Sequence, residues 1–408
     1  MSETSAAERT RVVVVGAGQA GLAAAWHLRR LGLEPGRDLV VLDRGPGTGG
    51  AWQHRWASLR LGTAHRLADL PGMTELGLSF GAADRDEPAR DVVARYYARY
   101  EDAYELRVRR PVEVTRVTDA TDDGGGLLVS VTGASGPLVT DVLVNATGTW
   151  GAPFVPAVPG REAFRGRQLH TAEWRDAKEL RGLRVVVVGG GTSAVGHLLD
   201  LEGVAASTTW ATRRRVRWHE GPELDVEHAV AAVAEQDRAA RAGRALPSIV
   251  SGTGLWLTRA SAAARERGVL VDRPMFTRIE QEAVVWPDGT RTPADAIVWA
   301  TGWRPELRHL APLGLRGPEG GVPVEDGVAL RDPRVLLAGY GPQASTLGAA
   351  RAARRTARAV LARLAGCGGG AAPPASRRAG APPRVPPRPR RSDTLPPREP
   401  HVGGGPVA

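Results

Sequence analysis

The stretch RVVVVGAGQAGLAAAWHLRRLG, residues 11–32, constrains the fold more than any other part of the chain. Its four consecutive valines are typical of a strand buried on both faces, and the Ala/Leu-rich run after the glycines is typical of a helix packed on that strand. Gly16 permits a tight turn, Gly18 lets the backbone approach a pyrophosphate, and Gly21 lets helix and strand pack closely. The stretch therefore predicts a strand, a glycine turn and a helix whose N-terminus faces a phosphate.

A second apolar strand is expected at residues 39–42, and it ends in Asp43. This acid follows Gly21 by 22 positions, the distance at which a carboxylate usually accepts hydrogen bonds from a ribose hydroxyl. A glycine-rich turn alone is a weak signal, because it can be no more than a turn. Strand, helix and acid in register predict an α/β domain that binds a dinucleotide.

The opening pattern repeats in RVVVVGGGTSAVGHLLDLEG, where the turn glycines are residues 189–191 and Ala194 takes the third position. The next strand, residues 207–212, leads into arginines, of which the first two are Arg213 and Arg214. An acid there would repel a 2'-phosphate, whereas a guanidinium binds one, so this half favours NADP(H) over NAD(H). A solvated arginine run is the alternative interpretation.

Two expected strands end in Ala-Thr-Gly, at residues 146–148 and 300–302. These small residues place bare backbone beside something that leaves no room for side chains. A closing strand at residues 335–338 leads through glycines to a helix that Ser345 or Thr346 can cap. The N-terminus of that helix would suit an electron-rich ring or an anion, or it is an ordinary closing helix.

The remaining segments are assigned from their apolar spacing. The expected elements are a helix at residues 91–107, a meander of strands at 112–117, 127–132 and 138–145, helices through 222–270, and a hairpin pairing 283–286 with 296–299.

The formal net charge of +10 comes from the C-terminal end of the 408-residue chain. Residues 349–365 contain five arginines and no acid, and residues 366–408 contain seven arginines against two acids, so the rest is formally neutral. A basic face that needs a nucleic-acid partner is therefore not expected. Residues 366–408 are rich in Pro, Gly and Arg and have almost nothing to bury, which predicts a disordered tail.

Cys367 is the only cysteine. Disulfide exchange needs two closely spaced thiols, so a dithiol reductase is excluded, and so is a disulfide within the chain, which suits a reducing cytosol. The polar N-terminus lacks the apolar core of a signal peptide, and no apolar run reaches the length of a membrane span. We therefore expect a cytoplasmic protein with no membrane partner.

Between the two glycine turns stands Phe164-x-Gly166-x-x-x-His170-x-x-x-Trp174. A single histidine in a loop is usually a hydrogen-bonded structural residue. Together with both turns and both Ala-Thr-Gly strand ends, however, the segment resembles the fingerprint of the class B flavin monooxygenase superfamily. This superfamily includes flavin-containing monooxygenases, Baeyer-Villiger monooxygenases and bacterial relatives. The resemblance extends over about residues 12–364.

The resemblance implies an α/β fold with two nested Rossmann-type dinucleotide-binding domains, in which an NADPH domain is inserted into a FAD domain. The implied division is 1–160 and 296–365 for the FAD domain, 161–183 for a linker that carries the fingerprint, 184–295 for the NADPH domain, and 366–408 for the tail.

The resemblance also implies which residues lie near the cofactors. Those expected near FAD are Gly16, Gly18, Gln19, Gly21, Asp43, Arg44, Gly50, Trp52, Gly339 and Leu347, and Thr301 and Gly302 complete the cofactor-binding set. Those expected near NADPH are Gly189, Gly191, Thr192, Ser193, Ala194, Arg213 and Arg214. His170 and Trp174 are the expected catalytic residues, and they would act by controlling the position of the nucleotide domain.

The implied activity is that of a FAD-dependent, NADPH-consuming monooxygenase. NADPH reduces the flavin, O2 adds to it, and the resulting C4a-peroxyflavin inserts one oxygen atom into a small organic substrate. The protein would mainly hold NADP in place and exclude water. The sequence leaves the substrate and the oligomeric state open.

Two departures from the family pattern keep other functions open. Arg175 follows the fingerprint Trp where Baeyer-Villiger enzymes usually have Pro or Asp, and Gly62 lies in a segment where many N- or S-oxygenating relatives have an asparagine near the flavin. One alternative is an NADPH-dependent flavin oxidase or reductase that releases hydrogen peroxide. The other is a non-catalytic nucleotide-binding flavoprotein whose Arg-rich tail binds a partner.

Overall fold

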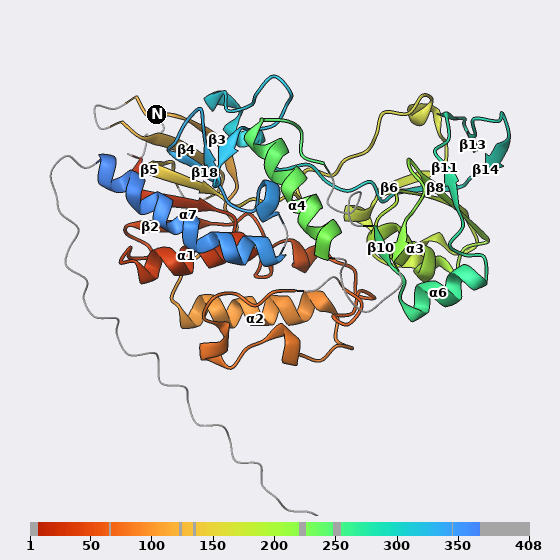
Figure 1. The fold of residues 1–408 in the computed structure, drawn as a ribbon, viewed down its shortest axis with the longest axis horizontal. Coiled ribbons are helices and arrows are strands. Elements are labelled where there is room, and N and C mark those ends of the chain that lie inside the picture. Colours follow the sequence, from red (N-terminus) through yellow and green to blue (C-terminus); the bar gives the residue numbers. More distant parts are fainter. Residues whose placement is uncertain are drawn as a thin grey trace, which may run out of the picture.

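The computed structural model forms two α/β units that lie side by side and are joined by extended connections (Figure 1). Within the described residues, the first unit contains an eight-stranded sheet and the second a five-stranded sheet. The chain leaves the first sheet, forms the second unit, and returns to complete the first. The structure describes residues 7–64, 67–121, 125–133, 136–219, 226–247, 254–344 and 346–367.

Valine-rich parallel strands form the centre of the first sheet. β1 (Glu8–Val15) lies between β2 (Leu39–Leu42) and β5 (Leu138–Asn145), and β18 (Val335–Leu337) continues the parallel order beside β5. The four valines of β1 point alternately into the cores on the two faces of the sheet. Burial on both faces is what a run of β-branched residues predicts.

Helices cover one face of this sheet. α1 (Gln19–Arg30) and α7 (Thr346–Cys367) pack against each other, and α2 (Ala89–Ala103) contributes to the same core (Figure 1). The core on the other face contains apolar side chains from residues 112–129, from the 3₁₀ helix Arg308–Leu313 and from residues 315–340, together with Ala240. The antiparallel strands of the sheet are β3 (Val114–Asp119), β4 (Leu127–Val131), β16 (Val324–Glu325) and β17 (Val328–Ala329). The bounds that the sequence predicted for the three strands of the meander and for α2 agree with these elements to within a few residues.

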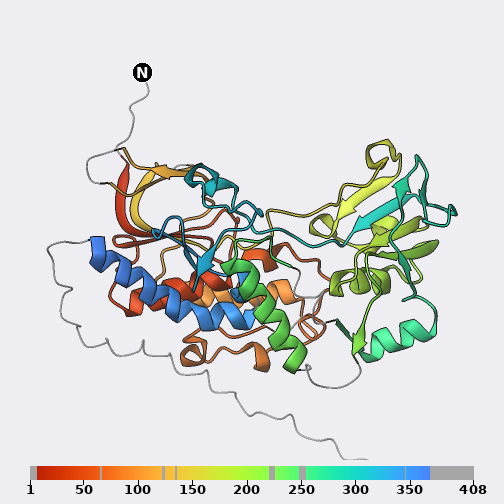
Figure 2. The ribbon, with the colours of Figure 1, turned by 45° about the horizontal axis from the view of Figure 1, so that its top comes forward.

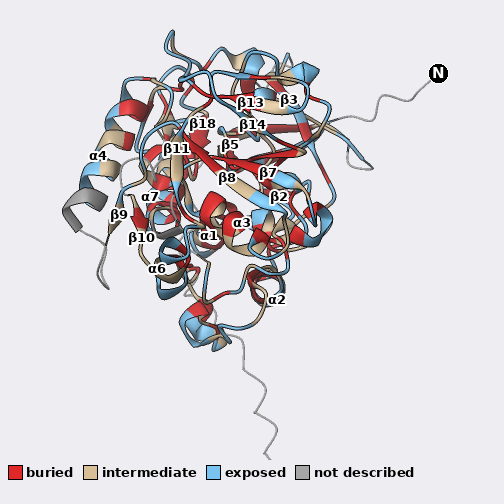
Figure 3. Cartoon of the chain, turned by 90° about the vertical axis from the view of Figure 1, so that its right-hand side faces the viewer, coloured by how far each residue is buried: buried red, intermediate tan, exposed pale blue. Residues whose placement is uncertain are grey.

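The second sheet is parallel throughout and runs in the order β11-β8-β7-β15-β6. Its strands are β6 (Arg167–His170), β7 (Arg184–Val188), β8 (Ser207–Thr212), β11 (Asp272–Pro274) and β15 (Ala296–Trp299). One face packs on α3 (Thr192–Leu201) and α6 (Arg259–Glu266), and the other on a small antiparallel sheet. Figure 3 shows the strands of both sheets as the buried centre of the molecule.

The structure corrects the hairpin that the sequence predicted. β13 (Ala283–Val285) pairs with β14 (Arg291–Pro293) and β12 (Arg278–Ile279), whereas β15 pairs in parallel with β7 and β6. The turn at residues 287–289 thus closes a shorter hairpin than expected. All four side chains of β15 are nearly inaccessible, as in a central parallel strand.

This pairing also changes the division of the chain. β15 was expected to open the second part of the FAD domain, and β6 was expected in a linker, but both are strands of the second sheet (Figure 2). The second unit therefore starts before residue 184 and continues past residue 295.

The described residues of the region 222–270 form the helices α4 (Val226–Arg241) and α6 and a short strand, instead of helices alone. β10 (Leu255–Trp256) pairs with β9 (Trp218–His219). Between these strands in sequence, α4 leaves the second unit and packs on the first (Figure 1). Its Arg241 forms a 3.2 Å ion pair with Glu325 of β16.

Two expectations at the C-terminal end lie partly or wholly outside the described residues. The tail 366–408 is described only through Cys367, and Ser345, one of the two expected capping residues of α7, is not described. Across the part of the chain that the structure describes, no helix has the length and apolar character needed to cross a membrane.

Candidate functional site

The first glycine turn is held in place by contacts that exclude side chains. Gly16 has φ +103°, and a Cβ on it would lie 2.5 Å from the carbonyl oxygen of Ala146. A Cβ on Gly21 would lie 1.8 Å from the carbonyl oxygen of Gly16. The turn therefore requires glycine at these two positions, as the sequence predicted. Gly16 is required because the Ala-Thr-Gly strand end at Ala146 packs against it.

The N-terminus of α1 is left open for an anion. Gly18 is its N-cap residue, no side chain caps the helix, and its first turn carries no acid. A Cβ on Gly50 would lie 2.7 Å from Cα of Gly18, so two glycine backbones meet there, and Gly339 follows β18 close to Ala20. Bare backbone beside an uncapped helix N-terminus is a suitable cradle for a phosphate.

Asp43 at the end of β2 reaches the same turn. One carboxylate oxygen accepts a hydrogen bond from the N–H of Ala17 at 2.6 Å, and the other accepts one from the N–H of Gly45 at 2.7 Å. The carboxylate is nearly buried, and Arg110 lies 3.9 Å away. The sequence therefore placed the acid correctly beside the glycine turn, where its remaining lone pairs can accept from a ligand hydroxyl.

The other residues expected near FAD surround this turn less tightly. Trp52 lies buried in the 3₁₀ helix Gly50–His54, two residues after Gly50. The amide nitrogen of Gln19 donates to the carbonyl oxygen of Ala68 at 3.3 Å. Arg44 is exposed, and its guanidinium lies 3.9 Å from the carboxylate of Glu306. Leu347 lies in the first turn of α7, but its side chain is outside the described part.

The second glycine turn repeats the construction of the first. Gly189 has φ +137°, and a Cβ on it would lie 2.1 Å from the carbonyl oxygen of Ala300, in the second Ala-Thr-Gly. α3 begins after N-cap Gly191 with no side-chain cap and no acid in its first turn. Thr192 and Ser193 open the helix near the surface, and Ala194 is fully buried. The two turns therefore share one local geometry.

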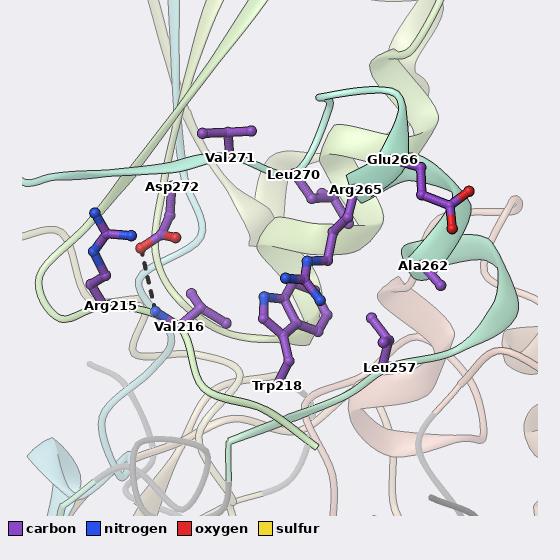
Figure 4. Close-up of a pocket in the computed structure, with 10 residues that line it drawn as sticks. All are labelled: Arg215, Val216, Trp218, Leu257, Ala262, Arg265, Glu266, Leu270, Val271 and Asp272. Carbon is purple, nitrogen blue, oxygen red and sulfur yellow. Dashed lines mark hydrogen bonds between the residues drawn. The ribbon is translucent and has the colours of Figure 1, made fainter. Parts of the chain in front are cut away.

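The arginines expected to select NADPH lie just beyond this turn. Arg213 and Arg214 are exposed and follow directly after β8. Beside the same loop is a cavity of about 610 Å³ (Figure 4). Arg265 places its guanidinium 5.4 Å from the centre of the Trp218 ring, and the N–H of Val216 donates to Asp272 at 3.3 Å. The cavity thus combines an aromatic face with two arginines, Arg215 and Arg265, and two acids, Glu266 and Asp272.

The two Ala-Thr-Gly strand ends lead into connections that run alongside each other. The N–H of Phe154 donates to the carbonyl oxygen of Gly302 at 2.9 Å, and the hydroxyl of Thr301 donates to the carbonyl oxygen of Phe154. In the same way, the hydroxyl of Thr147 donates to the carbonyl oxygen of Glu306 at 2.7 Å. Thr301 and Gly302 therefore belong to a two-stranded connection between the units.

His170 ends β6, and both of its ring nitrogens are engaged inside the protein. Nδ1 accepts from the N–H of Ala172 at 3.0 Å, so Nε2 carries the proton and donates to the carbonyl oxygen of Gly302 at 2.9 Å. Burial lowers the pKa of His170. The ring also packs edge-on against Trp303. This neutral histidine fastens β6 to the connection between the units.

Trp174 anchors the segment after β6 to α3. It is fully buried, and its ring centre lies 4.1 Å from that of His197. Nε2 of His197 and the hydroxyl of Thr171 are hydrogen-bonded at 3.1 Å. Burial, with a contribution from the charge of Arg55, lowers the pKa of His197 to about 3, so this ring is neutral. His197 is a residue that sequence reasoning missed.

A second feature that sequence reasoning missed is an aromatic cluster at the junction of the units. We call Trp52, Trp56, Trp150 and Trp303 the tryptophan cage, because the guanidinium of Arg55 lies within 6 Å of all four ring centres. Two of these tryptophans closely follow the two Ala-Thr-Gly motifs, which was a signal in the sequence. The other two stand in the glycine loop, and only the fold brings the pairs together.

This fold and these turns agree with what the comparisons show. Residues 13–238 match the family described as pyridine nucleotide-disulphide oxidoreductase, which is more than half of the chain. A flavin monooxygenase from Stenotrophomonas maltophilia, solved as a double mutant, is 34% identical, with a TM-score of 0.73 over 88% of this chain and 100% of that one. The chain belongs to the pyridine nucleotide-disulphide oxidoreductase family and, within it, to the flavin monooxygenases.

Curated relatives match over shorter stretches. A Baeyer-Villiger monooxygenase from Streptomyces coelicolor is 34% identical over 195 residues, which are 46% of this chain and 35% of that protein. An indole-3-pyruvate monooxygenase from Oryza sativa is 32% identical over 201 residues, 46% of this chain and 44% of that protein. The chain thus spans about half the length, or less, of the curated relatives it matches. The resemblance predicted from the motifs is confirmed at the level of the family.

Proposed function

We propose that the protein is a FAD-dependent, NADPH-consuming monooxygenase, with FAD at the first glycine turn and NADPH at the second. The observation that carries the proposal is the repeated geometry. Each turn has a glycine at positive φ pressed against the alanine of an Ala-Thr-Gly strand end, and each opens onto a helix N-terminus without a cap. Two such cradles in one chain suit two dinucleotides.

The first turn fits the pyrophosphate and ribose of FAD. A phosphate at the N-terminus of α1 meets bare backbone at Gly18 and Gly50, where added side chains would fill the cradle. Asp43 lies beside that turn, where a ribose hydroxyl can donate to it. Trp52, two residues after Gly50, provides a large apolar face against which the flavin ring could pack.

The second turn fits NADPH. Its pyrophosphate would meet the N-terminus of α3, where no acid opposes it. Arg213 and Arg214 follow β8, which occupies the place that β2 has in the first unit. Where β2 is followed by Asp43, β8 is followed by these arginines, and they would pair with the 2'-phosphate. The neighbouring cavity, with Trp218 and Arg265, offers a stacking face for the adenosine end of the nucleotide (Figure 4).

In this proposal the protein contributes positioning rather than acid–base chemistry. Bound FAD would accept a hydride from NADPH and activate O2 for transfer of one oxygen atom to a small organic substrate. The two helix N-termini orient the dinucleotides. His170 holds the end of β6 against Gly302 and so fixes the second unit relative to the connection. The buried side chains of Trp52 and Trp56 would keep water from the flavin and nicotinamide rings.

We further propose that the second sheet is an inserted nucleotide-binding domain. It would extend from β6 to β15, because both strands pair into that sheet, and the FAD domain would consist of the parts before and after it. The two backbone connections that carry Gly148 and Gly302 would then allow the domains to shift relative to each other during turnover.

The choice of NADPH over NADH provides a test. We expect Arg213→Ala with Arg214→Ala to raise KM for NADPH by about tenfold to a hundredfold, because charge-assisted hydrogen bonds to the phosphate are lost. KM for NADH should change little, since NADH lacks the phosphate. Arg217→Ala, an exposed arginine of the same loop, is the matched control. Equal losses for the two nucleotides would show that these arginines do not read the phosphate.

An NADPH oxidase that releases hydrogen peroxide is the second candidate, and Gly62 favours it. This residue offers no side chain to a flavin, and its backbone is engaged with Arg85: the N–H of Gly62 donates to the carbonyl oxygen of Arg85 at 2.8 Å. Recovery of all consumed oxygen as hydrogen peroxide with thioether, amine and ketone probes alike would support this candidate. Oxygenated product that matches NADPH consumption would exclude it.

A further inference from the structure

The tryptophan cage holds a positive charge at the junction of the two units. The guanidinium carbon of Arg55 lies 4.6 Å from the ring centre of Trp150 and 5.2 Å from that of Trp303. Trp52 and Trp56 lie at 5.8 and 5.9 Å. Aromatic faces attract a cation and offset part of its desolvation, but they do not neutralise its charge.

Arg55 has no counter-ion among the described residues. Its guanidinium donates no hydrogen bond to them and lies within 4 Å of no carboxylate there, and its Nε is buried without a partner. Burial lowers the pKa of Arg55 to about 10, which still leaves the side chain charged at neutral pH. Arg110, also largely buried, shows the usual arrangement, because its two terminal nitrogens bind Glu101 at 2.6 and 2.8 Å.

A largely desolvated guanidinium without an acid is costly unless a partner is supplied. In a flavoprotein a ligand can supply that partner. The fork of five N–H donors fits a carboxylate with two parallel hydrogen bonds. Four indole rings around the fork can pack against the apolar body of a small molecule.

The cage lies where ligands bind in α/β folds. Its members follow the carboxyl ends of β2, β5 and β15, and His170, at the carboxyl end of β6, packs on Trp303. Crevices beyond the carboxyl ends of parallel strands are the usual ligand sites of such sheets. The two pyrophosphates have their own cradles at the two helix N-termini, so neither of them takes Arg55. Trp52, which we place beside the flavin ring, would then lie between that ring and a third molecule held on Arg55.

We propose that Arg55 anchors the carboxylate of the substrate and that the tryptophan cage binds the substrate's apolar part. This inference rests on the proposed monooxygenase function and names its substrate class: small organic acids with an aromatic or aliphatic body. Oxygen transfer would occur at the far end of the molecule, while the carboxylate stays unchanged on Arg55.

The test compares two probes of nearly equal shape, phenylacetate and phenylacetamide. Their affinities are measured by calorimetry on the FAD-loaded, oxidised protein saturated with NADP⁺. We expect phenylacetate to bind at least about tenfold more tightly, and Arg55→Met to remove this preference by weakening phenylacetate alone by about tenfold to a hundredfold. Arg55→Lys should restore part of it. Arg60→Met, an exposed arginine of the same segment, should leave both affinities unchanged.

Three results would overturn the inference. One is equal affinity of the wild-type protein for the two probes. Another is a parallel loss of both probes in Arg55→Met and Arg55→Lys, which would assign Arg55 a structural role. The third is a preference that is present without NADP⁺ and absent with it, which would mean that the nucleotide is the partner of Arg55.

Failure of this inference is distinguishable from failure of the proposed function. Flavin content and the rate of flavin reduction by NADPH are measured on the same samples. Normal reduction without a carboxylate preference contradicts only the substrate class. A protein without flavin, or with flavin that NADPH does not reduce, would contradict the proposed monooxygenase function.

Discussion

At the scale of single residues, the positions that the sequence predicted well are those whose role is set by local backbone geometry. Gly16, Gly21 and Asp43 could be placed because spacing along a strand–turn–helix unit fixes where they lie. Arg55 and His197 could not, because their surroundings come from segments far apart in the chain. Their burial, and the lack of an acidic partner for Arg55 among the described residues, are properties of the tertiary structure alone.

The contact between Gly189 and Ala300 allows the second glycine turn to be tested. Gly189→Ala would place a methyl group 2.1 Å from a carbonyl oxygen at φ +137°, so the second turn must move. We expect flavin content to be retained and the affinity for NADPH to fall about tenfold or more, given the cost of such strain. Gly196→Ala in α3, the helix that follows this turn, meets nothing within 4 Å and is the control. Unchanged NADPH affinity would contradict the assignment of this turn.

The buried His197 predicts a loss of stability in acid. Its folded pKa of about 3 lies below the unfolded value of 6.5, so below pH 6.5 the unfolded chain binds a proton that the folded protein does not. The titration of His197 should therefore lower the free energy of unfolding by about 2 kcal/mol between pH 6.5 and pH 5. Above pH 7 it should contribute no change. Urea denaturation followed by circular dichroism measures this difference.

The histidine responsible can be identified with matched variants. His197→Phe should reduce the loss between pH 6.5 and pH 5 by about 2 kcal/mol, because no group is left there to titrate. His27→Phe should reduce it less, since that ring is only partly buried. An acid loss that is the same in His197→Phe and the wild type would rule out His197 as its source.

At the scale of elements, the sequence was accurate where a strand and its helix are neighbours and failed where pairing partners are distant. The meander, α1 and α3 follow from local patterns. The predicted hairpin was wrong because the apolar sequence of β15 does not indicate which strand it pairs with. It is equally compatible with β13 nearby and with β7, which lies more than 100 residues earlier. The position of α4 on the first unit also had no local signal.

The hydrogen bond between β6 and the connection gives a prediction at this scale. His170→Ala removes the 2.9 Å bond to Gly302 and frees the second unit to shift. We expect NADPH oxidation to continue while its yield of oxygenated product falls severalfold and hydrogen peroxide rises. Peroxide and product are quantified per NADPH. The control is His27→Ala, remote from the connection on α1. Normal coupling in His170→Ala would contradict a positioning role.

At the scale of the whole molecule, one turn geometry occurs twice, and each copy presses on the Ala-Thr-Gly motif that leads into the connection between the units. The sequence predicted this duplication from its repeated motifs, and the match to flavin monooxygenases supports it. The boundaries of the second unit were not predictable, because β6 and β15 enter its sheet from both flanks of the region that the motif defines. The tryptophan cage is a product of that same arrangement.

The central claim is that the protein uses NADPH and O2 to transfer oxygen. The most direct measurement mixes NADPH-reduced protein with O2 in a stopped-flow instrument and follows the flavin absorbance, with and without a thioether probe. We expect a spectrum that is neither that of reduced nor that of oxidised flavin; it should persist without the probe and decay in its presence as sulfoxide forms. Immediate return of the oxidised spectrum in both experiments, with one hydrogen peroxide per NADPH, would contradict the claim.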